Sequence, residues 1–351
     1  MSRLLSAWDR TPEDLRALGY ARDPRHLFGR LQRVHTWVEG RPALARAGRE
    51  LVDGSLDLSL PELLEAHPSG DGSTRLVLGL ADGERIEAVH MPRATRNPRV
   101  TICLSSQVGC ALGCTFCATA RMGLRRQLRA HEIVGQLLAV LQRLGPRSPQ
   151  ELTLVFMGMG EPLANVEALL RALDVLCDPA GMGLCPARIT VSTAGHLPGL
   201  RRLAASPHRP ALAVSVNAAT ERLRRSLMPV SKKWPLSELR AALVLWPLAP
   251  RERLTLEYVL LADVNDSVDD ADRLAAWIGD LRHVVNVIPF NVWGGVDDTE
   301  QAGPYREPSA ERILAFTARL RSHGSFVTVR KSRGRDARGA CGTLAVVPTT
   351  D

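Results

Sequence analysis

The chain has 351 residues, of which 45% are hydrophobic and 23% are charged. This is the composition of a globular protein with enough apolar material for a sizeable core. The sequence contains no run of 18 uncharged apolar residues, which excludes a membrane-spanning helix, and charges occur too early for a secretory signal. We therefore expect a cytoplasmic protein with no membrane partner.

The formal net charge is +8, and it is distributed unevenly. Residues 1–90 contain 12 Arg against 14 Asp and Glu, whereas residues 91–140 contain seven Arg against one acid. Residues 321–341 contain six basic residues against one acid. Concentrated positive charge favours a polyanionic partner, nucleic acid above all. A solvated basic face explains the same pattern, and charge alone does not separate the two explanations.

The first 95 residues predict a small accessory domain. Thr11 is a helix cap followed by Pro12 at the first helical position. The segments Arg75–Leu80 and Arg85–Met91 alternate around the turn signal Asp82-Gly83, as in a β-hairpin. Further helical patterns lie near residues 24–36, 43–52 and 60–66. We therefore predict helices and one hairpin over residues 1–95.

From about residue 99 the pattern changes to alternating strands and helices. Apolar, β-rich segments occur at 100–104, 152–157, 188–192, 211–216, 254–260, 284–289 and 325–329. Helical segments between them occur at 131–144, 164–177, 235–246, 267–280 and 308–322. The alternation predicts an α/β core over residues 96–325, in which helices cover a parallel sheet, open or closed as a barrel. Residues 326–351 would form a C-terminal strand and a tail rich in Gly and Arg.

Distinctive polar or glycine-containing motifs follow the predicted strands at their C-terminal ends. They are a cysteine-rich loop after residue 104, GMGEP at 158–162, Ser192, Ser215–Asn217 and Asn291. In barrels and open α/β sheets, ligands and catalytic groups gather at this edge. The sequence therefore predicts one site assembled from several loops.

The cysteine-rich loop is the strongest chemical signal. Cys110, Cys114 and Cys117 form C-x3-C-x2-C, and three thiolates on one tight loop can hold three irons of a [4Fe–4S] cluster. The fourth iron can then chelate the amino and carboxylate groups of S-adenosylmethionine. A zinc site is the alternative, but zinc would want a fourth Cys or His, and the nearest candidate is His131. Three buried core cysteines would be the explanation without function.

Several longer phrases carry a resemblance to a known family. They are TICLSSQVGCALGCTFC (101–117), FMGMGEPLANV (156–166), ITVSTAG (189–195), EYVLLADVNDS (257–267), NVIPFN (286–291) and VTVRKSRGRDARGACGTLA (327–345). With these phrases the sequence resembles the RlmN/Cfr family of radical S-adenosylmethionine RNA adenine methyltransferases. The resemblance covers residues 87 to 345. It implies a radical SAM partial (β/α)6 barrel, one [4Fe–4S] cluster, S-adenosylmethionine as cofactor and RNA as partner.

The resemblance also implies catalytic roles. Cys341 would accept a methyl group from one S-adenosylmethionine, and a second would be cleaved reductively to a radical that takes hydrogen from that methyl. Cys103 would release the modified RNA by attacking the bridging sulfur, and a thiol reductant would reopen the resulting disulfide. Glu87 resembles the family's proton acceptor. The reducing electron would come from a ferredoxin- or flavodoxin-type donor. Cys177 and Cys185 match no family site and are expected to be structural.

The cofactor contacts follow from the same resemblance. They would be Gly160, Glu161, Ser192, Ser215, Val216, Asn217 and Asn291. Glu161 would accept hydrogen bonds from the cofactor's amino group. Asn217 stands where the family usually has histidine, and asparagine cannot titrate near neutral pH.

The RNA target is implied less sharply. The family's usual substrate is an adenine of 23S rRNA methylated at C2, and some members also act on tRNA. Alternatives are C8 methylation of the rRNA adenine, the Cfr-like resistance activity, and a radical SAM enzyme with another RNA substrate. A non-catalytic iron–sulfur or zinc RNA-binding module is the alternative from outside the enzymes, against which GMGEP and Glu87 argue.

Overall fold

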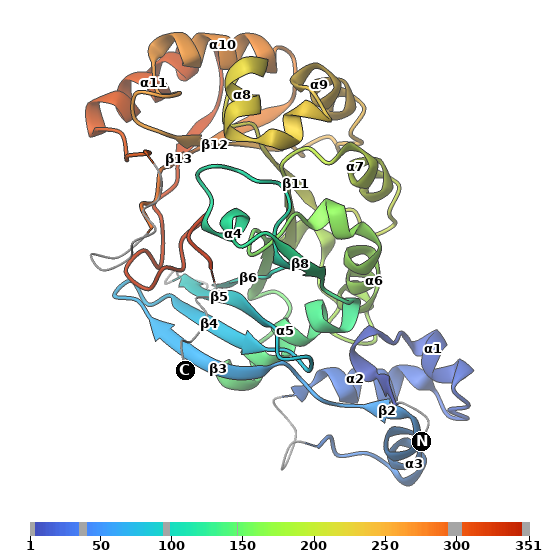
Figure 1. Cartoon of the computed structure of the whole chain (residues 1–351). Coiled ribbons are helices and arrows are strands. Elements are labelled where there is room, and N and C mark those ends of the chain that lie inside the picture. Colours follow the sequence, from blue (N-terminus) through green and yellow to red (C-terminus); the bar gives the residue numbers. More distant parts are fainter. Residues whose placement is uncertain (1–3, 35–40, 94–98, 146, 294–303, 346–351) are drawn as a thin grey trace.

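The structure is a computed structural model, and its central feature is one long sheet (Figure 1). It describes residues 4–34, 41–93, 99–145, 147–293 and 304–345. Within these residues the main sheet has ten strands in the order β14-β13-β12-β11-β10-β9-β6-β5-β4-β3. The order is not closed on itself, so the sheet has two edges.

Seven neighbouring strands of this sheet pair in parallel. They are β6 (Arg99–Cys103), β9 (Leu152–Phe156), β10 (Ile189–Thr193), β11 (Ala211–Ser215), β12 (Leu254–Leu260), β13 (His283–Pro289) and β14 (Val327–Val329). Short apolar runs are typical of strands covered by helices. The seven β-rich segments expected from the sequence are therefore confirmed. Six of these strands, β6 and β9 to β13, form an open (β/α)6 partial barrel.

Helices cover the outer side of the parallel strands (Figure 1). The longer ones are α5 (Ala130–Leu144), α6 (Val166–Cys177), α7 (Leu197–Ala204), α9 (Leu236–Val244), α10 (Val268–Ile278) and α11 (Ala310–Ser322). Each presents an apolar stripe to the sheet, for example Leu169, Leu173 and Leu176 of α6, all fully buried. The caps are local: Ser267 and Asp270 form a capping box at the start of α10.

The N-terminal helices pack beside α5 and α6. They are α1 (Pro12–Ala17), α2 (Pro24–Gln32) and α3 (Arg46–Ser55), joined by the short pair β1 (Leu5–Ser6) and β2 (Leu56–Asp57). The expected cap at Thr11 is confirmed, and Thr11 and Asp14 together form a capping box at the start of α1. Arg171 of α6 donates to the Asp9 carbonyl at 2.8 Å and pairs with Asp14. The last two residues of the helix expected over 24–36 lie outside the described residues.

The helix expected near residues 60–66 is wrong. Glu62–Pro68 is β3, an edge strand antiparallel to β4 (Thr74–Gly79). Leu63, Leu64 and Ala66 suggested a helical stripe, but pairing with β4 decides the local structure. The Leu64 side chain packs against Gly79 of β4. A Cβ atom added to this glycine would lie 3.1 Å from Leu64 Cδ1.

The expected hairpin is confirmed, and it extends the main sheet. β4 pairs antiparallel with β5 (Arg85–Arg93), and β5 pairs antiparallel with β6. The sheet is therefore continuous across residue 95, where we placed a domain boundary. The division into residues 1–95, 96–325 and 326–351 stays a prediction, and residues 94–98 and 346–351 lie outside the described residues.

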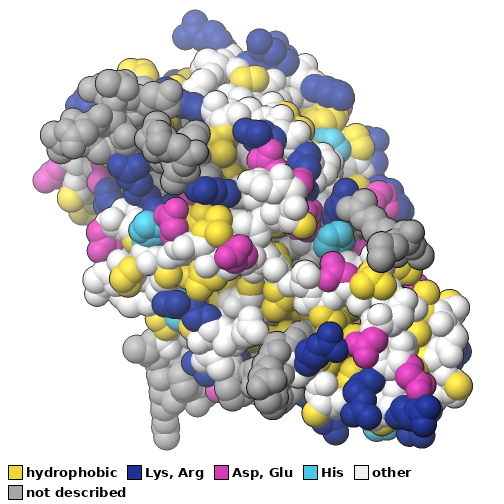
Figure 2. All heavy atoms as spheres, turned by 60° about the horizontal axis from the view of Figure 1, so that its bottom comes forward, with side chains coloured by type: hydrophobic (Ala, Val, Ile, Leu, Met, Phe, Trp, Pro, Cys, Tyr) yellow, Lys and Arg dark blue, Asp and Glu magenta, His cyan; other side chains and the backbone are white. Residues whose placement is uncertain are grey.

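Two further features bear on partners. Among the described residues, no helix is long and apolar enough to span a membrane. On the underside of the molecule, basic side chains are interspersed with acidic ones (Figure 2). Several arginines of the basic segments are also paired internally, such as Arg126 with Asp82 and Glu132, and Arg335 with Glu307. Part of the sequence's basic excess is therefore neutralised within the fold.

Candidate active site

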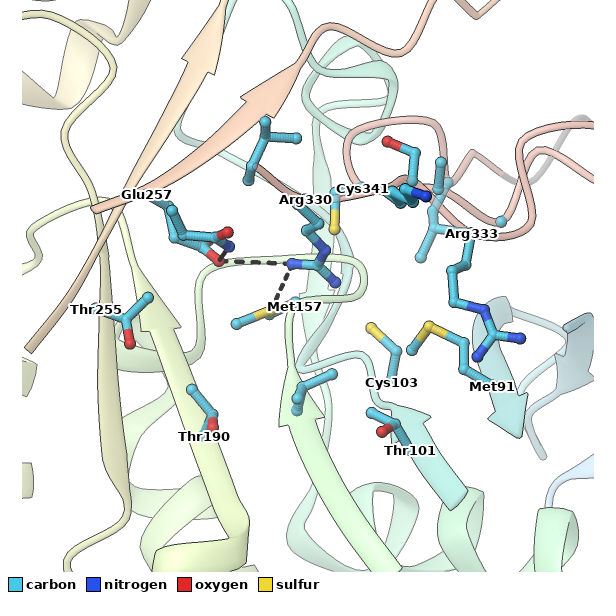
Figure 3. Close-up of a pocket in the computed structure, with 18 of the residues that line it drawn as sticks. Met91, Thr101, Cys103, Met157, Thr190, Thr255, Glu257, Arg330, Arg333 and Cys341 are labelled. Atoms are coloured by element: carbon cyan, nitrogen blue, oxygen red, sulfur yellow. Dashed lines mark hydrogen bonds and ion pairs between the residues drawn. The ribbon is translucent and has the colours of Figure 1, made fainter. Parts of the chain in front are cut away.

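Two adjoining cavities lie against the parallel strands: one at their C-terminal ends, and one that reaches Thr101, Thr190 and Thr255 within the strands. The cysteine-loop cavity is lined by Cys114, Cys117, Glu161, Ser192, Asn217 and Asn291, among others. The arginine cavity, about 420 Å³, is lined by Cys103, Thr101, Arg330, Lys331 and Arg333, among others (Figure 3). Met157, Glu257, Ile288 and Cys341 line both cavities. Side chains from both ends of the chain therefore meet at one place.

The cysteine loop is fixed by tight backbone contacts. It follows β7 (Gln107–Gly109), which pairs with β8 (Leu124–Gln127), and it ends at α4 (Ala118–Arg121). Cys110 N–H donates to the Gly123 carbonyl at 2.9 Å. Gly109 has φ of 73°, and a Cβ there would lie 1.8 Å from the Gly123 oxygen. Only glycine fits this position.

The three loop cysteines form one buried set of thiols. Burial raises the pKa of Cys110 to about 12 and raises the pKa values of Cys114 and Cys117. Three buried thiols in mutual electrostatic range need a positive partner to ionise. In the part of the chain that the structure describes, no three His, Cys, Asp or Glu side chains converge on one ion position. A donor set of three thiols on one loop suits three irons of a cluster, whereas structural zinc usually takes a fourth protein ligand.

Glu161 is aimed into the cysteine-loop cavity by backbone groups. Its side chain is buried, and it accepts hydrogen bonds from Leu163 N–H at 3.1 Å and Ala194 N–H at 2.8 Å. Burial raises its pKa. Gly160 has φ of 103° and packs on Gln107, whose Cβ would lie 2.6 Å from an added Cβ. Gly160 does not line the cavity. Its positive φ lets the backbone turn into Glu161.

Ser192 and Asn291 contribute polar groups to the same cavity. Ser192 Oγ donates to Glu257 at 3.4 Å, and Ser215 also lines the wall. Asn291 Nδ2 donates to the Cys341 carbonyl at 3.1 Å, while its Oδ1 is buried without a partner in the described structure. A buried unpartnered amide oxygen facing a cavity is suited to a donor on a ligand. Val216 is buried behind the wall.

Asn217 has a structural reason to be asparagine. Its φ is 57°, in the left-handed region that asparagine tolerates better than most residues. Its Oδ1 accepts from Val259 N–H at 2.8 Å, and its carbonyl accepts from Asn265 Nδ2 at 2.7 Å. The residue thus joins the ends of β11 and β12. Asn217 therefore lines the cavity and also holds these two strand ends together.

Cys103 and Cys341 lie near each other in the arginine cavity, although 238 positions separate them in the chain (Figure 3). Burial raises the pKa of Cys103 to about 12, opposed in part by Arg330 and by a hydrogen bond from the Met157 backbone. Burial also raises the pKa of Cys341, and Arg330 opposes this too. The two expected catalytic sulfurs are therefore brought together.

Glu87 lies outside both cavities. It sits on β5, is fully buried and pairs with Arg75, while its Oε2 has no partner in the described structure. Burial raises its pKa. The C-terminal segment covers it: Arg75 Nε donates to the Ala337 carbonyl at 2.7 Å, and Ala345 N–H faces the carboxylate. In this conformation Glu87 cannot reach a substrate base.

Sequence reasoning missed three site residues. Glu257 and Arg330 stand inside the quoted phrases EYVLLADVNDS and VTVRKSRG, and a charge within an apolar strand or at its end was the available signal. Arg224 carried no signal, because RLRRSL reads as an exposed helix. It is fully buried, donates to the Ala194 carbonyl at 2.7 Å and the Val216 carbonyl at 3.0 Å, and burial lowers its pKa to about 10.

Comparisons with known proteins identify the family. Residues 104–275 match the radical SAM superfamily. The chain is 44% identical over 321 residues to a dual-specificity RNA methyltransferase RlmN of Syntrophobacter fumaroxidans, covering 91% of this chain and 89% of the relative. It is 38% identical to a probable dual-specificity RNA methyltransferase RlmN of Akkermansia muciniphila, covering 93% and 92%.

A solved structure extends the agreement to the whole fold. A radical SAM methyltransferase from Sphaerobacter thermophilus superposes with a TM-score of 0.86 at 37% identity, covering 97% of this chain and 99% of that one. The identities and coverages, together with the cysteine loop and the paired Cys103 and Cys341, support one assignment. The chain belongs to the RlmN/Cfr family of radical SAM RNA methyltransferases.

Proposed function

We propose that this protein methylates C2 of an adenine in structured RNA, with Cys341 as the methyl carrier and Cys103 as the residue that releases the product. The observation that carries the proposal is that both cysteines line the arginine cavity, while Cys341 also lines the cavity of the cluster cysteines. One sulfur can therefore face the cofactor on one side and the substrate on the other. The proposed RNA is 23S rRNA, with tRNA as a further substrate.

A carrier is needed because an adenine C2 carbon is a poor nucleophile. In the first stage the Cys341 sulfur would form a bond to the methyl carbon of S-adenosylmethionine as the sulfonium bond breaks, and the thiol proton would go to solvent. A [4Fe–4S] cluster on Cys110, Cys114 and Cys117 would supply the electron that cleaves a second S-adenosylmethionine. Glu161 and Asn291 would orient the cofactor beside these cysteines.

The methylene radical on the Cys341 sulfur would add to C2, and loss of the C2 proton and of one electron, which would return to the cluster, would leave a protein–RNA thioether. Release of the product would use the second sulfur. Cys103 as a thiolate would attack the Cys341 sulfur of the protein–RNA thioether, forming a sulfur–sulfur bond and breaking the sulfur–carbon bond. The electron pair would pass to the methylene carbon, which takes a proton to become the methyl group. A thiol reductant would then return both cysteines to the reduced state. The electron for the cluster would come from a ferredoxin- or flavodoxin-type donor.

The role of Glu87 as proton acceptor requires movement of the C-terminal segment. Arg75, Ala337 and Ala345 surround its carboxylate in the described conformation. Displacing residues 337–345 would uncover it on the side of β5 that faces the arginine cavity. RNA is a suitable agent, since Arg93 and Lys331 at this cavity can hold phosphates.

Mass spectrometry of nucleosides tests the proposal. Enzyme reconstituted anaerobically with iron and sulfide would be incubated with rRNA or tRNA, S-adenosylmethionine and a reductant. We expect 2-methyladenosine from wild type and from Cys185→Ala, and none from Cys341→Ala. Cys185 is exposed and lines neither cavity, so it is the matched control. 8-Methyladenosine would contradict the assignment to C2, and methylation by Cys341→Ala would contradict the carrier mechanism.

A further inference from the structure

Arg330 lines the arginine cavity beside Glu257 and Met157. It follows β14, and its backbone N–H donates to the Val287 carbonyl at 2.8 Å. Its Nη1 lies 3.5 Å from Glu257 Oε1 and 3.6 Å from Met157 Sδ. In Figure 3 its guanidinium lies between Glu257 and the side where Cys341 and Cys103 present their sulfurs. The position is fixed from both the backbone and the side chain.

The other arginine labelled in this view is held away from the sulfurs. Arg333 Nη2 donates to the Asp71 carbonyl at 2.7 Å, and its Nε lies 3.3 Å from Asp71 Oδ2. It also donates to the Pro92 carbonyl. Both arginines line the same cavity, but Figure 3 shows the Arg333 guanidinium pointing away from Cys341. Of the two arginines labelled in Figure 3, Arg330 is therefore the one directed at the two cysteines.

The charges around Arg330 limit how many anions it can support. Glu257 already contributes one negative charge at 3.5 Å. With one thiolate, the set of Arg330, Glu257 and the sulfur has a net charge of −1. Two thiolates would give this set a net charge of −2 in a mostly buried space. Burial penalises each of them. The two sulfurs must therefore use the guanidinium one at a time.

We propose that Arg330 is a positioning residue that serves Cys341 and Cys103 in turn. It first holds the Cys341 sulfur as an anion for methyl acceptance. Methylation turns that sulfur into a neutral thioether, which leaves the guanidinium to hold the Cys103 sulfur for product release. This order of use rests on the proposed function, but the charge arrangement itself does not. The pKa of Arg330 is raised, mainly by the nearby Cys341 and to a smaller extent by Glu257 and Cys103.

Thiol alkylation in cluster-loaded protein measures this effect without RNA. The rate of iodoacetamide addition to Cys341 and Cys103 would be followed at neutral pH by peptide mass spectrometry. We expect Arg330→Gln to slow Cys341 at least about tenfold, because a thiol reacts through its thiolate. Arg330→Lys and the matched control Arg333→Gln should stay within about threefold of wild type. A wild-type rate in Arg330→Gln, or equal loss in the lysine and glutamine variants, would overturn the proposal.

The sequential part has its own test. The alkylation rate of Cys103 would be measured in three proteins that all carry Cys341→Ala. We expect it to be about tenfold higher when residue 330 is the native Arg330, or carries Arg330→Lys, than when it carries Arg330→Gln. Equal Cys103 rates in the three proteins would refute the second role. If Arg330→Gln does not fold, Glu257→Gln replaces it: removing this negative neighbour should speed Cys341, and slower reaction would overturn the proposal. Failure of the proposed function shows separately, as absence of methyl on wild-type Cys341 after incubation with S-adenosylmethionine.

Discussion

Replacing Asn217 by alanine should destabilise the fold through two separable effects. The first is conformational, because φ of 57° costs an ordinary L-residue about 1–2 kcal/mol. The second is the loss of the acceptor for Val259 N–H, at 2.8 Å, which leaves a partly buried donor and costs about 1–3 kcal/mol. We therefore expect Asn217→Ala to lower the free energy of unfolding by about 2–5 kcal/mol.

Two further variants separate these effects. Asn217→Gly removes the hydrogen bond but tolerates the positive φ, so it should be about 1 kcal/mol less destabilising than alanine. Asp263→Ala is the control for conformation, since Asp263 has φ of 59° and loses besides only an exposed ion pair with Arg306, which contributes little. It should cost about 1 kcal/mol.

Urea unfolding followed by circular dichroism gives the three free energies. The reasoning fails if Asn217→Gly is as destabilised as Asn217→Ala, or if Asn217→Ala matches Asp263→Ala. The result also bears on the departure from the family's histidine. If asparagine is held here by backbone geometry, Asn217→His should lose stability even though it restores the family residue.

Three other changes have defined outcomes. Cys103→Ala should leave the enzyme covalently attached to RNA, seen as a protein band that RNase treatment shifts; full turnover with free RNA would exclude its releasing role. Gly109→Ala should lower the iron content of reconstituted protein severely, because the added Cβ would meet the Gly123 oxygen, whereas Gly123→Ala, with φ of 66° and nothing within 4 Å, should retain most iron. Arg224→Met should lower the free energy of unfolding by about 3 kcal/mol or more, because two buried carbonyls lose their donor. Arg222 lies on the exposed face of the same helix, α8 (Glu221–Leu227), and Arg222→Met should be near neutral in the same urea assay.

The parallel core was predictable because its signals are local. The strands β6 and β9 to β13 are short apolar runs, all but β12 end at a distinctive motif, and the cysteine spacing is set within one loop. The edge strand β3 was not predictable in the same way. The Leu63, Leu64 and Ala66 pattern suits a helix, and only the partner strand β4 decides against it.

The candidate site was predictable in its members but not in its electrostatics. Cys103 and Cys341 could be named from the phrases that contain them, yet their shared neighbour Arg330 depends on how β14 returns to the sheet. Glu87 shows the opposite case. Its residue type and phrase point to the site, but the packing of residues 337–345 over Arg75 keeps it covered, and no local pattern encodes that contact.

The central claim is that the methyl group passes through Cys341 to the RNA base, and a single-turnover transfer tests it most directly. Protein would first be loaded with a deuterium-labelled methyl group, freed of cofactor, and then given RNA, a reductant and unlabelled S-adenosylmethionine. We predict that the first adenine product carries the deuterium label and that Cys341 loses it. An unlabelled first product, with the labelled methyl still on Cys341, would contradict the account.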